Sequence, residues 1–168
     1  TLDDNLLEHL DVEKRGETLH LGLKRGTSVR DVTLEASISM PEMSKLDASG
    51  ASETTFSDFT ASDDLDVSVS GASRISGRLT AEEIQLDLSG ASRIELDGTA
   101  GEASMKISGA SSARLEDFTV TSATASLSGA SSVDLDVTGK IHELDLSGAS
   151  TLRYTGDPVV GDINTSGG

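Results

Sequence analysis

Six serines at the same place in a repeated tetrapeptide are the first candidates for chemistry in this sequence. The tetrapeptide Ser-Gly-Ala-Ser occurs six times, and its second serines are Ser52, Ser73, Ser92, Ser111, Ser131 and Ser150. A serine acts as a nucleophile when a neighbouring base takes its proton, and no histidine recurs beside the tetrapeptide. The repetition therefore indicates a recurrent corner of the chain, where glycine permits a bend that other residues resist.

Carboxylates are the second group of candidate catalytic residues. The candidates are Asp63, Asp64 and Asp66 in one segment, Asp134 and Asp136 in another, and Asp87 and Asp145 at equivalent places of their repeats. Paired carboxylates cleave polysaccharides in hydrolases, and lyases use acids with a basic side chain. Acids this numerous are more typical of a solvated face, and the net charge of −16 repels an acidic polysaccharide. We therefore expect no catalytic residue, and a β-helix polysaccharide lyase or hydrolase is the least favoured function.

Metal and cofactor signals are weak. Asp63, Asp64 and Asp66 offer oxygen ligands for calcium, but the Gly-Gly-x-Gly-x-Asp nonapeptide of calcium-loaded β-rolls does not occur. His9, His20 and His142 are scattered without the spacing of a transition-metal site. Every glycine-rich element belongs to a repeat, so none resembles a phosphate-binding loop. We expect no metal site and no cofactor.

Composition narrows the class of protein further. The chain has 168 residues, of which 35% are hydrophobic and 2% aromatic, and it has no cysteine. Such an acidic surface is repelled by nucleic acid, and no apolar run reaches the roughly 18 residues that span a bilayer. The sequence therefore predicts neither nucleic-acid binding nor membrane insertion of this segment.

The repeat itself predicts the fold. The glycines of the tetrapeptide are Gly50, Gly71, Gly90, Gly109, Gly129 and Gly148, so successive repeats are 19 to 21 residues apart, and Ser166-Gly167-Gly168 forms a degenerate seventh copy. A fixed period of this size is typical of a solenoid, in which each repeat is one coil. Apolar residues alternate with polar ones on both sides of each glycine, which indicates strands. We predict an all-β fold, a right-handed single-stranded parallel β-helix of about 20 residues per coil.

The alternation also predicts which side chains face the interior. Inward positions lie two and four residues before the glycine and two, four and six residues after it, so the second serine points inward, and its hydroxyl can bond along the stack. The apolar members before the glycine are Ala48, Val69, Leu88, Ile107, Leu127 and Leu146, with Leu46, Val67, Leu86, Met105, Ala125, Leu144 and Ile163. Those after it include Ile75, Ile94, Ala113, Val133 and Leu152, with Phe56, Leu96, Leu115, Leu135 and Tyr154, while Gly77 interrupts the second of these files. We expect an interior too narrow for large rings.

The period is lost before the first tetrapeptide. We predict one solenoid domain, 1–168, in which residues 1–43 form irregular N-terminal coils and residues 44–168 form the Ser-Gly-Ala-Ser coils. Within the first part, residues 4–10 predict a single helical turn, and two short strands are expected around the turn at Lys14-Arg15-Gly16-Glu17. Residues 32–40 predict a further strand that is stopped by Pro41.

The repeats resemble a known family. The segment Ile-Gln-Leu-Asp-Leu-Ser-Gly-Ala-Ser-Arg-Ile-Glu-Leu-Asp-Gly at residues 84–98 is similar to repeats of the GIN domain, the head domain of autotransporter adhesins. Other segments also resemble this family. They are residues 40–46, which lead into the first repeat, Tyr154-x-Gly156-x-Pro158 and Ser166-Gly167-Gly168 at the end of the repeats, and Asn5-Leu6-Leu7 with Leu19-His20-Leu21 before them. One departure is that the family opens with a further strand pair and a Gln-Gly turn, which this sequence lacks.

The resemblance implies a right-handed β-helix in the envelope of a bacterium or archaeon, or outside the cell. It implies a non-enzyme that binds a surface ligand, either a protein or a glycan, with adhesion as the inferred role. A self-assembling scaffold of joined coils, and hence a homo-oligomer, is the alternative that the repeats leave open.

Overall fold

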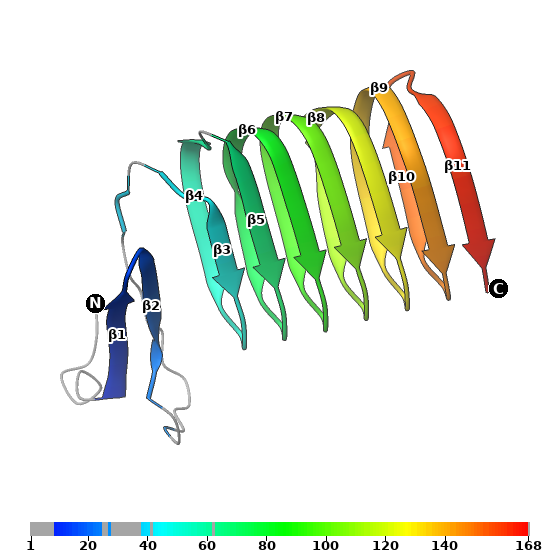
Figure 1. Ribbon diagram of the computed structural model, residues 1–168. Helices are drawn as coiled ribbons and strands as arrows, with labels where there is room; N and C mark the ends of the chain where they lie inside the picture. Colours follow the sequence, from blue (N-terminus) through cyan, green and yellow to red (C-terminus); the bar gives the residue numbers. More distant parts are fainter. Residues whose placement is uncertain (1–8, 25–26, 28–37, 41, 62, 168) are drawn as a thin grey trace. The chain divides into compact units, whose positions relative to one another are not determined.

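A computed structural model describes residues 9–24, 27, 38–40, 42–61 and 63–167 of the chain. Contacts divide the chain into two compact units, residues 1–40 and residues 41–168. Every secondary-structure element assigned in the described residues is a β-strand. Figure 1 shows the strands of each unit in chain order.

The first unit contains an antiparallel hairpin. Strand β1 (Leu10–Arg15) pairs with β2 (Thr18–Leu23), and Gly16 takes a φ of +63° in the turn. This confirms the two strands predicted around Gly16. Within β1 the guanidinium of Arg15 donates a 2.7 Å hydrogen bond to Glu13, which raises the pKa of Arg15 above its ordinary value.

Two other predictions for the first unit fall largely outside the described residues. Residues 4–8 of the helical turn expected over residues 4–10 are not described, while His9 lies in a short 3₁₀ turn and Leu10 already begins β1. Of the strand expected over residues 32–40, only residues 38–40 are described, and they carry no strand.

The second unit is a parallel β-solenoid of about six turns, roughly 19 residues apart. Its strands are β3 (Lys45–Ala48), β4 (Glu53–Thr60), β5 (Asp64–Val69), β6 (Arg74–Leu88), β7 (Arg93–Ile107), β8 (Ser112–Leu127), β9 (Ser132–Ser147), β10 (Thr151–Thr155) and β11 (Val159–Ser166). They are stacked in the order β10-β9-β8-β7-β6-β5-β3, with β4 on β6 and β11 on β9, and every pairing is parallel. The predicted fold class is confirmed.

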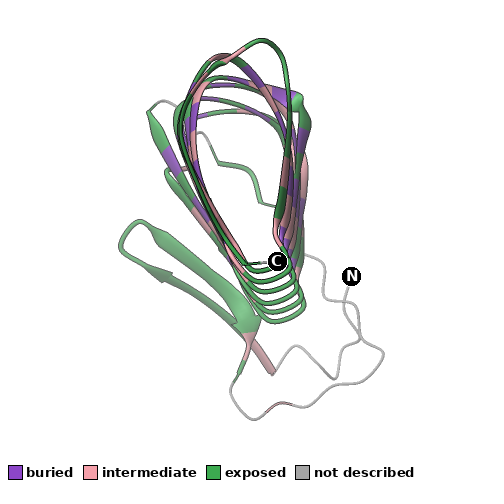
Figure 2. Ribbon diagram, turned by 90° about the vertical axis from the view of Figure 1, so that its right-hand side faces the viewer, coloured by how far each residue is buried: buried purple, intermediate pink, exposed green. Residues whose placement is uncertain are grey.

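Each middle coil consists of one long strand that bends through both sides of a flattened loop. Strands β6 to β9 contain 15 or 16 residues each, and a Ser-Gly-Ala-Ser corner joins every one to the next. In Figure 2 the coils are seen along the stack, with buried segments on both sides of the loop. The first half of each strand follows one corner, and the second half leads into the next.

The core consists of stacked files of side chains, as the alternation predicts. The inward positions before and after the corners of the middle coils are almost inaccessible to solvent. The buried members include Val67, Val69, Ile75, Leu86, Leu88, Ile94, Leu96, Met105, Ile107, Ala113, Leu115, Ala125, Leu127, Val133, Leu135 and Leu144. The apolar residues of this chain are thus used on the interior of the solenoid.

The expectation that large rings are excluded from the interior is wrong at one position. Phe118 in β8 is fully buried within the core. Its register partner on the preceding coil is Gly98, which contributes no side chain at this height of the stack. A similar exchange occurs at Phe56, whose ring lies where a side chain of its register partner Gly77 would be. A large ring is therefore accommodated where the adjacent coil has glycine.

Candidate functional site

The Ser-Gly-Ala-Ser corners form a regular column along one edge of the solenoid. Their glycines adopt φ values between +70° and +80°, a left-handed conformation that favours glycine. The N–H of the alanine that follows donates to the glycine carbonyl of the preceding coil, as in the 2.8 Å bond from Ala110 to Gly90. The column is therefore a ladder of main-chain hydrogen bonds with exposed alanines along its surface.

The second serine of each corner points inward, as the alternation predicts. Ser73, Ser92, Ser111 and Ser131 are buried. The hydroxyl bonds differ in part from the expected pattern, because they mostly close their own corner. Ser92 Oγ donates to the Ser89 carbonyl at 2.6 Å and Ser131 Oγ to the Ser128 carbonyl at 2.7 Å.

Among these second serines of the described corners, one hydroxyl-to-hydroxyl bond runs along the stack, from Ser52 Oγ to Ser73 Oγ at 3.2 Å, and the Ser92 N–H donates to Ser111 Oγ at 3.4 Å. The inward serines face the core and hold the corner closed. This arrangement supports the interpretation that they are structural.

The candidate carboxylates lie on the outside of the coils and bond to the neighbouring strand. Asp134 forms an ion pair with Arg153 at 3.4 Å, and Asp136 accepts hydrogen bonds from Thr119 at 2.7 Å and from Thr155 at 3.1 Å. These two acids are two residues apart on β9, with the buried Leu135 between them, and their contacts join the strands on both sides of β9. The two carboxylates thus connect β9 to the neighbouring coils through side-chain contacts.

The remaining candidate acids are dispersed along the stack. Asp63, Asp64 and Asp66 are exposed at and before β5. Asp87 accepts a 3.3 Å bond from Gln85, and Asp145 accepts a 2.9 Å bond from Asn164. Within the described residues, no group of three or more histidines, aspartates and glutamates is placed to hold a metal ion.

The three histidines are placed on different elements. His9 precedes β1, His20 lies in β2 opposite Glu13, and His142 is exposed in β9. Over the part of the chain that the structure describes, no helix has the length and hydropathy needed to cross a membrane.

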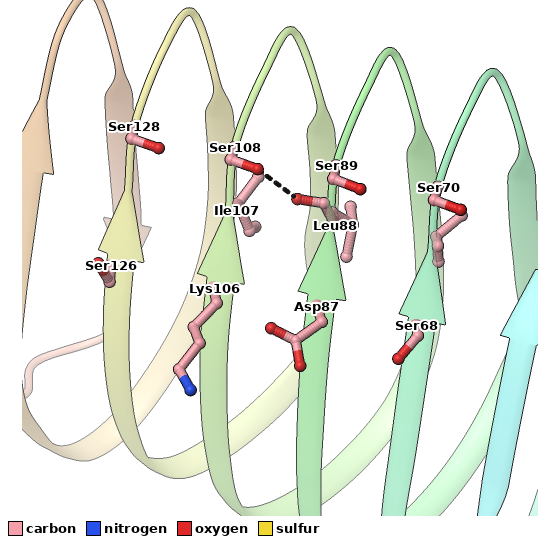
Figure 3. A pocket seen from close by; sticks show the side chains of 11 residues that line it. Ser68, Ser70, Asp87, Leu88, Ser89, Lys106, Ile107, Ser108, Ser126 and Ser128 are labelled. Carbon is pink, nitrogen blue, oxygen red and sulfur yellow. Dashed lines mark hydrogen bonds between the residues drawn. The ribbon is translucent and has the colours of Figure 1, made fainter. Parts of the chain in front are cut away.

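Two grooves flank the column of corners. The first has a volume of about 420 Å³ and lies over the strand ends that lead into the corners. We call it the serine groove, because it is lined by Ser68, Ser70, Ser89, Ser108, Ser126 and Ser128. Figure 3 shows the side chains of Asp87 and Lys106 on adjacent strands at its edge, and the 3.3 Å hydrogen bond from Ser108 Oγ to the Leu88 carbonyl.

The second groove lies on the other side of the corners and has a volume of about 310 Å³. We call it the arginine groove, because Arg74 and Arg93 line it side by side as register partners on β6 and β7. Glu53 also lines this groove, together with exposed alanines and second serines of the corner column and Ser112, the register partner of Arg93 on β8.

Arg74 and Arg93 are not among the candidate residues predicted from the sequence. The signal was present, because Arg74 and Arg93 both stand three residues after the corner glycine of adjacent repeats. Equal repeat positions are stacked in a solenoid, so a basic residue recurring at one repeat position predicts a basic file.

Comparison with known proteins places the chain in a family. A family model described as "Putative auto-transporter adhesin, head GIN domain" matches residues 1–158. The chain belongs to this family. No protein among those with curated functions matches the sequence of this GIN-domain chain.

A solved structure shares the fold. It is a protein from Parabacteroides distasonis ATCC 8503 that is named a putative lipid binding protein, and it superposes with a TM-score of 0.70 at 19% sequence identity. The match covers 99% of the present chain and 80% of that protein. At this identity the likeness shows a common fold.

Proposed function

We propose that this GIN-domain chain is a non-catalytic binding domain at the cell surface or outside the cell, and that it recognises its ligand through the outer face of the solenoid. The proposal rests on the different roles of the inward-facing and outward-facing side chains in the middle coils. Inward positions are used for the core and for closing the corners, whereas both grooves open outward beside the corner column. Membership of an adhesin-like family supports the surface location.

The contacts of the acidic residues support a role without catalysis. Hydrolysis of a glycosidic bond typically uses a pair of carboxyl groups that flank one substrate. Asp134 and Asp136 instead bond to residues of the coils on either side. These contacts make them part of the lateral packing between coils.

The name of the solved neighbour raises lipid as a ligand class. In the present chain the solenoid interior is filled by its own side chains, from Leu65 to Leu144. An acyl chain would therefore have to lie in an outer groove, and both grooves are lined mainly by serine, alanine and charged residues. The favoured ligand is therefore a polar surface molecule, either a glycan or a protein.

A binding screen tests the proposed function directly. The full chain is applied to arrays of glycans, surface proteins and phosphatidylcholine vesicles, and light scattering across a salt series confirms that the signal is not self-assembly. Saturable binding to a glycan or protein supports the proposal. Absence of saturable binding to every array would contradict it, as would turnover of a polysaccharide that is lost on Asp136→Asn.

A further inference from the structure

Arg74 and Arg93 are two like charges held next to each other without an acidic partner. They occupy equal positions on adjacent parallel strands, which are about 4.8 Å apart. Among the described residues no carboxylate forms an ion pair with either guanidinium. Arg74 is exposed and Arg93 is partly buried, so both heads are accessible from the groove.

The other arginines of the solenoid each form an ion pair with a carboxylate. Arg78 pairs with Asp97 at 3.8 Å, Arg114 with Glu95 at 3.8 Å and Arg153 with Asp134 at 3.4 Å, each from one coil to the next. In a chain with a net charge of −16, acids are available almost everywhere. An adjacent pair of arginines without such a partner is therefore a local exception.

Two carboxylates face this pair from the same side of the sheet. Glu53 is the register partner of Arg74 on β4, and Glu95 lies two residues after Arg93 on β7, where it pairs with Arg114. On the remaining side the register partner of Arg93 is Ser112, a neutral hydroxyl. An anion that approaches from the Ser112 side therefore meets the two guanidinium groups on the side away from Glu53.

We propose that the arginine groove binds the acidic group of a sugar residue, a carboxylate or a sulfate ester, with one oxyanion bridging Arg74 and Arg93. This inference rests on the proposed binding function and names its ligand class. A guanidinium presents donors in a planar fork that fits a carboxylate or sulfate, and charge-assisted bonds of this type are the strong ones. The volume of about 310 Å³ and the small alanine and serine side chains of the lining leave room for the ring that carries the anion.

The surroundings select a sparsely charged glycan over other anionic molecules. A polyanion would extend past Glu53 and Glu95 onto an acidic surface, which repels it. A peptide that adds to a sheet needs an exposed strand edge, whereas β6 and β7 are paired on both sides. A single acidic sugar at the end of a neutral glycan meets neither obstacle.

Isothermal titration of the full chain tests the inference. The probes are methyl glucuronoside, glucose 6-sulfate and, as the neutral comparison, methyl glucoside. We expect both acidic sugars to bind and the neutral one not to bind. Arg74→Ala and Arg93→Ala should each weaken binding at least about tenfold, the effect of losing one charge-assisted hydrogen bond.

Three further variants make the test specific. Lys140→Ala removes one positive charge from an exposed position of β9 that lines neither groove, and binding should stay within about twofold, because an exposed charge beyond the groove is largely screened. Arg93→Lys keeps the charge without the fork and should fall between wild type and Arg93→Ala. Glu53→Gln removes the nearest acid and should strengthen binding. Thermal melts of all variants confirm that each is folded.

The results separate this inference from the proposed function. If neither acidic sugar binds while the array screen finds another ligand, the inference is wrong and the binding function stands. If Lys140→Ala weakens binding as much as Arg93→Ala, the interaction is a general charge effect and the inference is again wrong. If the arrays also show no ligand, the proposed function itself fails.

Discussion

The middle coils and the last coil of the solenoid have the same sequence pattern but very different burial. Leu144 on β9 is 3% exposed, whereas its register partner Ile163 on β11 is 55% exposed. Likewise Leu135 is 1% exposed and its partner Tyr154 on β10 is 44% exposed. An inward residue in a solenoid is therefore buried mainly by the coils on both sides of it. An apolar side chain at the same repeat position contributes less to the free energy of folding in the last coil than in a middle coil.

The corner glycines show the same contrast at the other end. Gly50 and Gly109 have φ values of +80° and +76°, so both need the left-handed conformation. A Cβ on Gly109 would lie within 3.0 Å of the Gly90 carbonyl oxygen, whereas one on Gly50 would meet nothing within 4 Å. Glycine is thus required for conformation at every corner, and for close stacking only where a coil precedes it.

The largest effect is expected for Gly109→Val. The substitution places a branched side chain against the Gly90 carbonyl in a conformation that valine resists, so we expect a loss of about 3 kcal/mol or more. Because each coil contacts only its neighbours, the damage should divide urea unfolding into two steps. Lys106→Ala, on an exposed position three residues earlier, should change stability by at most about 0.5 kcal/mol. Equal small effects of the two variants in urea melts would contradict the close stacking of the corners.

The next effect compares two register partners. Leu144→Ala should cost about 2 to 4 kcal/mol, because it leaves a cavity between two coils. Ile163→Ala should cost less than about 1 kcal/mol, because that side chain is already half in solvent. Thermal and urea denaturation of both variants measure the difference. Equal costs would show that an additional element covers β11.

These contrasts explain why so much of the solenoid is predictable from sequence. The corner spacing and the alternation around it predict the parallel stack and the inward files, because contacts in a solenoid join equal positions of successive repeats. The burial of Phe118 escaped this reasoning, since it depends on the register partner Gly98. The repeat from Gly109 to Gly129 is 20 residues long, one more than the repeat before it, and the extra residue shifts the register between Glu95 and Gly98 of the paired strand. The glycine spacing shows that a residue is added but not where in the repeat it lies.

The candidate site was less predictable for a related reason. Attention to residue types with familiar chemistry selected the aspartates and serines, which the structure uses for contacts between coils and for closing corners. The arginine groove depends on which side chains remain without a partner after stacking. That property follows from the register and the side-chain geometry of Arg74, Arg93 and their neighbours, and single repeats do not contain it.

A smaller effect separates the two requirements at the corners. Gly50→Ala meets no neighbouring atom and should cost only the strain of a positive φ, about 1 to 2 kcal/mol. Gly109→Ala has the same strain and adds the contact with the Gly90 carbonyl, so it should be clearly more destabilising. Parallel urea melts give the difference between the two alanine variants. A difference of zero would mean that the coils move apart at no cost.

The smallest effect concerns the hydroxyl that closes each corner. Ser131 Oγ donates to the Ser128 carbonyl at 2.7 Å and Ser150 Oγ to the Ser147 carbonyl at 2.8 Å, so the two bonds are alike. Ser131 is buried between coils, and Ser131→Ala should cost about 1 kcal/mol because the carbonyl loses a partner away from water. Ser150 is only partly buried in the last corner, where water can replace the hydroxyl, so Ser150→Ala should cost less than about 0.5 kcal/mol. Differential scanning calorimetry of the two variants measures both costs under one condition. If Ser150→Ala lowers stability as much as Ser131→Ala, the contribution of the hydrogen bond depends on the local geometry of the corner and does not depend on burial between coils.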